Sequence, residues 1–267
     1  MDPLSLNDLI RLDGKGAIVT GAAKGIGYGI GYRLAEAGAG VLIADVDREA
    51  AEEAAAGLAA KGWRTVAAGV DVSDEQQVRA MVGDCRSAFG SVDILVNNAG
   101  IYPNQPLAQM RLADFQRVLD VNLTALFLTT KHASEAMKAQ GNGGRIVNVT
   151  SIDAIHPSMV GFAHYDASKH GAWGFTKNSA LELAEHGIWV NAIAPGGIAT
   201  PGVEELQRAS GGQVEPGELV RAFLAKIPMH RLGHPDEVGR AALFLASELS
   251  AYMTGSQVVV DGGALLS

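Results

Sequence analysis

The sequence has few of the residues that would indicate a disulfide framework, a metal site or a membrane span. Its 267 residues include one cysteine, Cys85, which excludes an internal disulfide and a cysteine-rich metal site. Histidines and carboxylates do not cluster at metal-ligand spacing, so no catalytic metal is expected. No apolar run approaches the roughly 20 residues that a membrane-spanning helix needs.

Positive charge is also scarce, with 21 Lys and Arg against 29 Asp and Glu and a net charge of −8. Without a basic surface, nucleic acid and anionic membranes are not expected as partners. The first residues, MDPLSLNDLIRL, are acidic where a secretory signal would be basic, so we expect a cytoplasmic protein. The 48% of hydrophobic residues predict a globular chain with a sizeable core.

Short apolar runs alternate along the chain with segments of helical pattern. The runs expected to form strands are 16–20, 40–45, 65–71, 93–100, 145–151, 189–195 and 256–263. The segments expected to form helices are 26–38, 47–62, 73–89 with Ser73 as N-cap, 112–139, 165–185 and 236–247. This alternation predicts one α/β domain over residues 1–267, with a Rossmann-like doubly wound parallel sheet of about seven strands and helices on both faces.

A glycine-rich turn, TGAAKGIG, follows the first expected strand and precedes the first helix. Glycine lets the backbone bend tightly and approach a diphosphate, and the amino terminus of the helix supplies unpaired N–H groups. The gap between the first two glycines is wider than in the G-x-G-x-x-G fingerprint. The turn predicts a nucleotide site that includes Gly21, Lys24, Gly25, Ile26 and Gly27.

Polar residues follow the next strands at the same edge of the predicted sheet. Asp45 ends the second strand about twenty residues beyond the turn, where a carboxylate can accept hydrogen bonds from an adenosine ribose. Asp71 ends the third strand and is placed to meet the adenine. Aspartates also cap helices, and Asp47 is expected to do only that. The cofactor site is therefore expected to include Asp45, Val46, Asp71, Val72, Asn98, Ala99 and Gly100.

The stretch from Ser151 to Lys169 carries the groups suited to proton transfer. Tyr165 and Lys169 are four residues apart and share one face of a helix. A neighbouring ammonium favours the phenolate and brings the pKa of the phenol toward neutrality. Ser151 ends the preceding strand, where its hydroxyl can hold a carbonyl or carbinol oxygen. A tyrosine and a lysine at this spacing are also common on ordinary helices.

Taken together, the motifs resemble those of the short-chain dehydrogenase/reductase family, of the simple single-domain kind. The resemblance covers nearly the whole chain, from GAIVTGAAKGIG to QVVVDGG. Its pieces are the TGAAKGIG turn, Asp71, NNAG at 97–100, Asn122 in VNLTALF, Ser151, YDASK at 165–169 and PGGIAT at 195–200.

The resemblance implies a role for each catalytic residue. Tyr165 would be the acid/base, and Ser151 would hold the substrate oxygen and stabilise developing charge. Lys169 would bind the nicotinamide ribose hydroxyls and lower the pKa of the phenol. Asn122 would shape its helix locally and hold a water that links Lys169 to solvent.

The resemblance also implies how the nicotinamide and the substrate are held. The nicotinamide would lie along Pro195, Gly196, Ile198 and Thr200, and a lid at about 197–228 would fold over the substrate. His156 and His164 are expected to line the pocket or lie at the surface. The substrate pocket is expected to draw on Tyr102, Ser151, Asp153, His156, Met159, Phe162 and Tyr165, a mixture suited to a small secondary alcohol, polyol, sugar or ketone.

Two residues point in opposite directions on the choice of cofactor. Lys24 could meet the 2′-phosphate of NADP, whereas Asp45 would bind both ribose hydroxyls of NAD and repel that phosphate. Like charges at about 4 Å cost on the order of 4 kcal/mol at an effective dielectric of 20. A flexible lysine returns only part of this, so NAD is expected to be preferred.

Three functions remain open. An NAD-dependent alcohol dehydrogenase or carbonyl reductase is favoured over a 3-ketoacyl-carrier-protein reductase, which would normally use NADP and want basic residues for its acidic carrier. A non-catalytic nucleotide-binding regulator would not need Ser151, Tyr165 and Lys169 together. Apolar residues surround the helices at 112–139 and 165–185, and the resemblance implies that these helices build a homotetramer.

Overall fold

Seven parallel strands form one sheet in the computed structural model, which describes residues 3–157, 159–200 and 224–267. Their order across the sheet is β3-β2-β1-β4-β5-β6-β7, and the winding reverses between β1 and β4. The strands are β1 Gly16–Thr20, β2 Gly40–Asp45, β3 Thr65–Gly69, β4 Ile94–Asn97, β5 Gly144–Val149, β6 Ile188–Pro195 and β7 Gln257–Val260. The predicted doubly wound sheet is confirmed.

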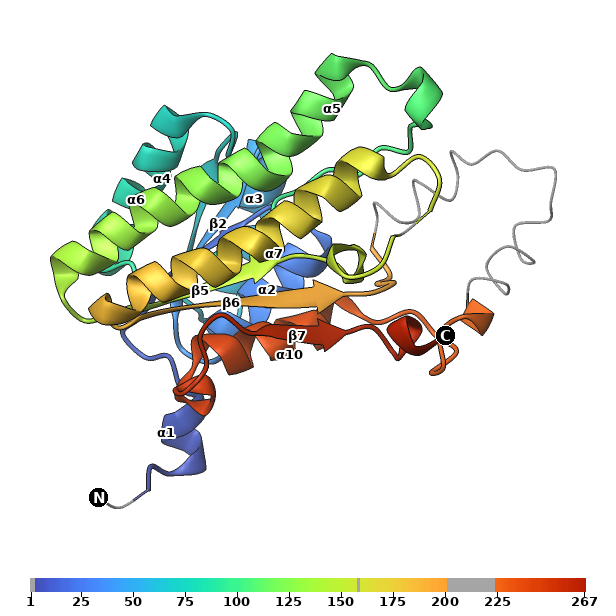
Figure 1. The fold of residues 1–267 in the computed structure, drawn as a ribbon. Coiled ribbons are helices and arrows are strands. Elements are labelled where there is room, and N and C mark those ends of the chain that lie inside the picture. Colours follow the sequence, from blue (N-terminus) through green and yellow to red (C-terminus); the bar gives the residue numbers. More distant parts are fainter. Residues whose placement is uncertain (1–2, 158, 201–223) are drawn as a thin grey trace.

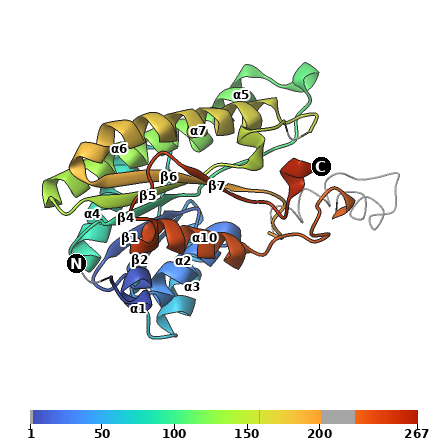
Figure 2. The same ribbon diagram turned by 60° about the horizontal axis from the view of Figure 1, so that its bottom comes forward.

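Helices cover both faces of the sheet (Figures 1 and 2). One face packs against α2 Gly25–Glu36, α3 Arg48–Ala59 and α10 Pro235–Ala246, and the other against α4 Glu75–Phe89, α6 Ala125–Gln140 and α7 Ala163–Leu183. Side chains of β1 alternate between the layers, because Ala17 and Val19 join the first core and Ile18 the second. All three are fully buried.

The helix predicted over 112–139 is present but is not uniform. It consists of α5 Leu112–Leu119, a π-turn at Asp120–Thr124, and α6. Figure 1 shows these pieces as one long rod. The π-turn contains Asn122, the residue that the resemblance implies to shape the helix locally. Single π-turns inside α-helices are frequent at functional sites.

The predicted N-cap of α4 is wrong. Asp74, not Ser73, caps the helix, and its carboxylate accepts hydrogen bonds from the backbone N–H groups of Gln76 and Gln77. The Ser73 hydroxyl instead donates to Asp71. The expected capping role of Asp47 is confirmed, because its side chain accepts from the N–H of Ala50 at the start of α3.

The amino-terminal segment contains a short helix, α1 Leu6–Ile10, that the sequence pattern did not predict. Among the described residues, no helix is long and apolar enough to cross a membrane. Of the predicted lid, residues 201–223 lie outside the described residues. Its two ends, at 197–200 and 224–228, are described.

Several strands end before the polar residues that were assigned to them. β3 ends at Gly69 and β4 at Asn97, so Asp71 and Asn98 follow their strands. Ser151 likewise follows β5, which ends at Val149. These residues lie beyond the carboxyl edge of the sheet, where open α/β sheets bind their ligands.

Candidate active site

A cavity of about 1510 Å³ lies at the carboxyl ends of the strands. It is larger than the roughly 300–1,000 Å³ of a single-ligand pocket, so a dinucleotide and a small substrate fit it together. The predicted cofactor residues that line it are Gly21, Lys24, Gly25, Ile26, Gly27, Asp45, Val46, Asp71, Val72, Asn98, Ala99, Gly100, Tyr165, Lys169, Pro195, Gly196, Ile198 and Thr200. The predicted substrate residues that line it are Tyr102, Ser151, Asp153, His156, Met159, Phe162 and Tyr165.

The glycine turn has a backbone that other residues would not fit. Gly21 and Gly25 have φ of +60° and +58°, in the left-handed region. A Cβ on Gly27 would lie 2.1 Å from the carbonyl oxygen of Gly21. Helix α2 begins at Gly25, and its N-cap residue, Lys24, makes no side-chain capping bond. The first N–H groups of α2 are therefore open to an anion.

Backbone N–H groups hold the Asp45 carboxylate beside this turn. Its Oδ2 accepts from the N–H of Ala23 at 3.1 Å, and its Oδ1 accepts from the N–H of Asp47 at 3.2 Å. Lys24 is exposed, and within the described part of the chain no ion pair joins it to Asp45. Among the described residues, the carboxylate thus stands at the end of β2 without a cation at contact distance.

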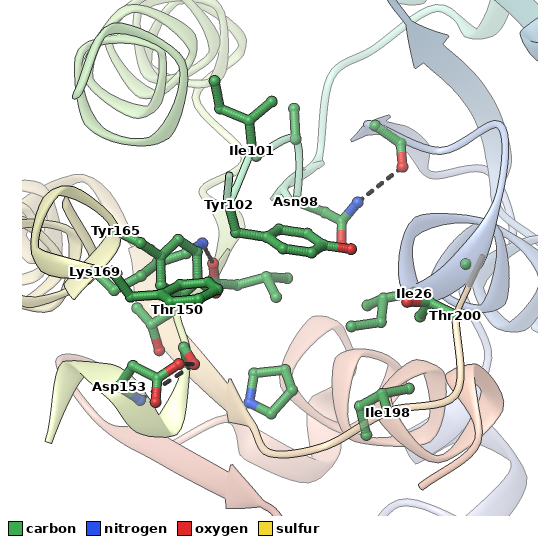
Figure 3. A pocket seen from close by; sticks show the side chains of 18 of the residues that line it. Ile26, Asn98, Ile101, Tyr102, Thr150, Asp153, Tyr165, Lys169, Ile198 and Thr200 are labelled. Atoms are coloured by element: carbon green, nitrogen blue, oxygen red, sulfur yellow. Dashed lines mark hydrogen bonds between the residues drawn. The ribbon is translucent and has the colours of Figure 1, made fainter. Parts of the chain in front are cut away.

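Hydrogen bonds join the end of β4 to the end of β1. The Asn98 side-chain amide donates to the carbonyl oxygens of Thr20 and Gly21, each at 2.9 Å (Figure 3). The Thr20 hydroxyl accepts in turn from the N–H groups of Asn98 and Ala99. A Cβ on Gly21 would lie 2.8 Å from the Cα of Ala99. The NNAG segment therefore fixes the glycine turn against the sheet.

Lys169 lies one turn after Tyr165 on α7, and its ammonium is buried. Its Nζ donates to the carbonyl oxygen of Val149 at 2.9 Å and lies 5.5 Å from the centre of the Tyr165 ring. Only 5% of the residue is exposed. Burial disfavours the charged form and lowers the pKa of Lys169 to about 8.

The half-buried Tyr165 ring stands between two other aromatic rings. Tyr102 and Phe162 each have their ring centres 6.0 Å from that of Tyr165, in edge-to-face arrangements. Burial, and next the negative charge of Asp153, raise the pKa of the phenol well above its ordinary value. The sequence predicted the opposite direction. The difference arises because the phenol is itself buried, and the negative charge of Asp153 adds to the rise.

Asp153 holds the hydroxyl of Ser151, on the turn that follows β5. Ser151 Oγ donates to Asp153 Oδ2 at 2.9 Å and accepts from the N–H of Asp153 at 3.2 Å. Figure 3 shows Asp153 on the opposite side of the cavity from Asn98. Ser151 also lies beside the phenol, where its hydroxyl opposes the rise in the pKa of Tyr165. Burial raises the pKa of Asp153.

Asn122 is the one predicted site residue outside the main cavity. It lines a small neighbouring pocket together with Lys169. Its Oδ1 accepts from the N–H of Ile101 at 2.8 Å, and its Nδ2 donates to the carbonyl oxygen of Ile101 and to Ser168 Oγ. Asn122 thus ties the π-turn to the loop after β4 and to α7. Its expected water remains a prediction.

The two histidines near the site differ in position. His156 is exposed and lines the cavity, and its Nδ1 is 2.9 Å from the carbonyl oxygen of Pro157. His164 was expected in the pocket or at the surface, and this is wrong. It is fully buried, and its Nδ1 accepts from the N–H of Tyr165 at 2.8 Å. The histidine therefore positions the first turn of α7.

Some cavity residues were not predicted because no motif contains them. They come from α5 and the π-turn, which supply Gln116, Arg117 and Asp120, and from the carboxyl-terminal end, which supplies Ala264, Leu265 and Ser267. Only the tertiary fold brings these segments to the site. Within the described ranges, no group of three or more His, Cys, Asp or Glu side chains could hold a metal ion.

Comparisons with known proteins agree with this geometry. Residues 21–264 match the family model described as enoyl-(acyl carrier protein) reductase. A short chain dehydrogenase/reductase of Aspergillus oryzae is 39% identical over 96% of both chains. A 3-oxoacyl-[acyl-carrier-protein] reductase of Thermotoga maritima is 38% identical over 96% of this chain and 100% of its own.

A solved structure extends the likeness to the whole fold. The structure of a 7α-hydroxysteroid dehydrogenase complexed with NADH and 7-oxo glycochenodeoxycholic acid superposes with a TM-score of 0.90. Its sequence is 35% identical, over 97% of this chain and 98% of that chain. With the matched family model, the similar relatives and the predicted residues Ser151, Tyr165 and Lys169 in one cavity, the chain belongs to the short-chain dehydrogenase/reductase family.

Proposed function

We propose that the protein is an NAD-dependent oxidoreductase that transfers a hydride between nicotinamide and a small secondary alcohol, polyol, sugar or ketone. The carrying observation is that Ser151, Tyr165 and Lys169 line one cavity with the glycine turn. The solved relative with bound NADH supports this cofactor class. NAD, when bound, accepts or supplies the hydride, and the protein supplies orientation and proton transfer.

The residues for holding NAD follow from the donors and acceptors of the cavity. The open N–H groups at the start of α2 would bind the diphosphate, and Asp45 the adenosine ribose. Asp71 would meet the adenine. Lys169, which keeps donors beyond its bond to Val149, would bind the nicotinamide ribose. The segment from Pro195 to Thr200 would lie along the nicotinamide ring.

Proton transfer at the substrate oxygen falls to Tyr165. The raised pKa keeps the phenol protonated at neutral pH, which is the form that donates to a carbonyl oxygen in reduction. Oxidation of an alcohol requires the phenolate, so its rate should rise with pH. Ser151 would bind the same oxygen as charge develops on it. The buried Lys169 Nζ lies beside the ring and can relay the proton.

The position of Asp45 supports a preference for NAD over NADP as the cofactor. Its carboxylate has no cation at contact distance among the described residues, so a 2′-phosphate would meet an uncompensated negative charge. Such a contact costs on the order of 4 kcal/mol per unit pair at an effective dielectric of 20. The exposed Lys24 offsets only part of this. We propose that kcat/KM favours NAD at least about tenfold.

Replacing the phenol tests the proposed activity. Tyr165→Phe keeps the ring between Tyr102 and Phe162 and removes only the ionisable oxygen. Turnover in an assay of cofactor absorbance over secondary alcohols, polyols and ketones should fall about 10²–10⁴-fold. Cofactor affinity should stay within a few-fold. A variant that keeps more than about a tenth of the wild-type rate would show that Tyr165 is not the acid/base.

A second candidate is reduction of a 3-oxoacyl group on a carrier protein. The name of the Thermotoga maritima relative and the description of the family model support it. Asp45 makes this function less favoured in this chain, because such reductases normally use NADP and the carboxylate of Asp45 would repel the 2′-phosphate of NADP. Rates with NADPH and a 3-oxoacyl thioester would distinguish the two. A purely regulatory protein would show no turnover with either panel.

We also propose a homotetramer, assembled through α6 and α7. Phe127 on α6 is 46% exposed and Leu181 on α7 is 79% exposed. The rings of Phe127 and Phe175 meet edge to face across the two helices. An apolar surface of this kind is suited to a two-fold interface. A cytoplasmic location and the lack of nucleic-acid and membrane partners remain predictions.

A further inference from the structure

Asp153 places a carboxylate in the wall of the cavity beside the reacting groups. It lies on the short turn Ile152–Ala154, two residues after Ser151, and is half-buried. In the described ranges, Ser151 Oγ is the only side chain that donates to it, and no Lys or Arg forms an ion pair with it. Its remaining acceptor positions are therefore open toward the cavity.

This bond also changes what Ser151 offers. The hydroxyl has one proton, which it donates to Asp153 in this structure. To hold a substrate carbonyl or carbinol oxygen, Ser151 turns this proton to the substrate, and the Asp153 oxygen that accepted it becomes open. Asp153 is acceptor-only when ionised, with several lone pairs on its two oxygens. The serine and the carboxylate together then offer a donor for the reacting oxygen and an acceptor for a second group, and their oxygens are 2.9 Å apart.

The spacing of this pair matches oxygens on neighbouring carbons. Two vicinal hydroxyl oxygens lie about one hydrogen-bond length apart, about 2.8 Å. A substrate that holds its reacting oxygen at Ser151 thus brings a second hydroxyl on the next carbon to Asp153. The aromatic side chains of Tyr102 and Phe162 flank Tyr165 and leave apolar surface for the carbon skeleton.

The negative charge of this part of the cavity determines which substrate groups it favours. Asp153 and Asp166 both raise the pKa of Tyr165, so negative potential reaches the reacting phenol. The opposing charges near Asp153 are those of Lys169 and His156. A substrate carboxylate next to the reacting carbon would meet this carboxylate at short range, whereas a hydroxyl or ammonium donor would bind it.

We propose that Asp153 is a specificity-determining residue, which selects substrates with a second hydrogen-bond donor on the carbon next to the reacting carbinol or carbonyl. The substrate class is that of vicinal diols and α-hydroxy ketones, and a vicinal amino alcohol offers the same donor chemistry. A carboxylate at that position is disfavoured. This inference rests on the proposed oxidoreductase function.

A matched set of ring alcohols tests it with the full-length protein and NAD. The substrates are cyclohexanol, cyclohexane-1,2-diol, 2-aminocyclohexanol and 2-hydroxycyclohexanecarboxylate, compared by kcat/KM. We expect the wild type to prefer the diol over cyclohexanol at least about tenfold. Asp153→Leu should reduce this ratio to within about twofold. Asp153→Asn keeps the shape, and should retain part of the diol preference while using the carboxylate at least about tenfold better.

The ratios of kcat/KM between these substrates distinguish a role of Asp153 in specificity from a purely structural role. Ile155→Val, on an exposed neighbour that does not line the cavity, is the control and should leave the ratios unchanged. Equal loss on all four substrates in Asp153→Leu would overturn the inference, because a disturbed Ser151 affects every alcohol alike. A wild type that oxidises cyclohexanol and the diol equally would overturn it while the oxidoreductase function stands. A wild type that oxidises none of the set would overturn the inference, whereas the oxidoreductase function is tested separately by the wider panel with Tyr165→Phe. A preference for the amino alcohol over the diol would support the inference and identify the donor as an amine.

Discussion

Lys169 is predicted to destabilise the folded protein at neutral and acidic pH. The residue is only 5% exposed, and the pKa of its ammonium falls from the ordinary 10.5 to about 8. Burial is the larger cause, and Asp153 opposes it. The lower pKa means that the folded state binds this proton less tightly than the unfolded chain does. Lys169→Met removes the charge and keeps an unbranched side chain of similar length.

The size of the effect follows from the shift. From 10.5 to about 8, at about 1.36 kcal/mol per pKa unit, burying the ammonium costs about 3 kcal/mol. The full cost applies below pH 8, where the lysine is protonated in both states. Between pH 8 and 10.5 only the unfolded chain holds the proton, so wild-type stability rises with pH. Loss of the hydrogen bond to Val149 lowers the free energy of unfolding of the variant by about 1–3 kcal/mol at every pH.

The assay is urea unfolding of the full-length wild type and variant at pH 6.0 and pH 9.5. We expect the stability difference, variant minus wild type, to be about 2 kcal/mol smaller at pH 9.5. Lys138→Met, at an exposed lysine of α6, is the matched control and should show no such change. A difference that is the same at both pH values would refute the reasoning. Turnover should fall even where the variant is the more stable protein.

Three further outcomes can be measured. Asp45→Ala should narrow the preference for NAD mainly by admitting NADP beside Lys24, and initial rates with both cofactors decide this; equal use of NADP by the wild type would show that Lys24 sets the choice. Light scattering at micromolar protein should give the mass of a tetramer, and a monomeric mass would contradict the proposed assembly. His164→Asn, which keeps an acceptor for the N–H of Tyr165, should be more stable than His164→Phe by about 1–3 kcal/mol in urea unfolding; equal stability would show that this bond is unimportant.

Local motifs were sufficient to predict most of the site. The glycine turn, Asp45 and the NNAG segment each follow a strand, and parallel strands bring their carboxyl ends to one edge. Once alternation predicted the winding, the place of these residues in one cavity followed. The Tyr165 and Lys169 spacing needed only the geometry of one helix.

Features that depend on three-dimensional packing were missed. Ser73 and Asp74 are both good N-cap residues, and the choice depends on the Ser73 hydroxyl being bound by Asp71. His164 was expected to line the pocket or lie at the surface, yet it is fully buried and accepts from the N–H of Tyr165. No sequence motif marks the carboxyl-terminal residues Leu265 and Ser267, and only the tertiary fold places them at the cavity.

The direction of the Tyr165 pKa shift shows what the family motif does not determine. The motif places an ammonium one turn from the phenol, but it does not determine how far the phenol is buried, which is the larger cause of the shift, or the charge on the turn after β5. In this chain Asp153 occupies that turn, faces the phenol and holds Ser151. On its proposed role, a substrate donor bound to Asp153 screens the carboxylate and so removes part of the rise in the pKa of the phenol, while the contribution of burial remains. The same hydrogen bond to Asp153 would then select the substrate and help to activate Tyr165. A substrate that lacks the donor should therefore have a lower kcat as well as a higher KM.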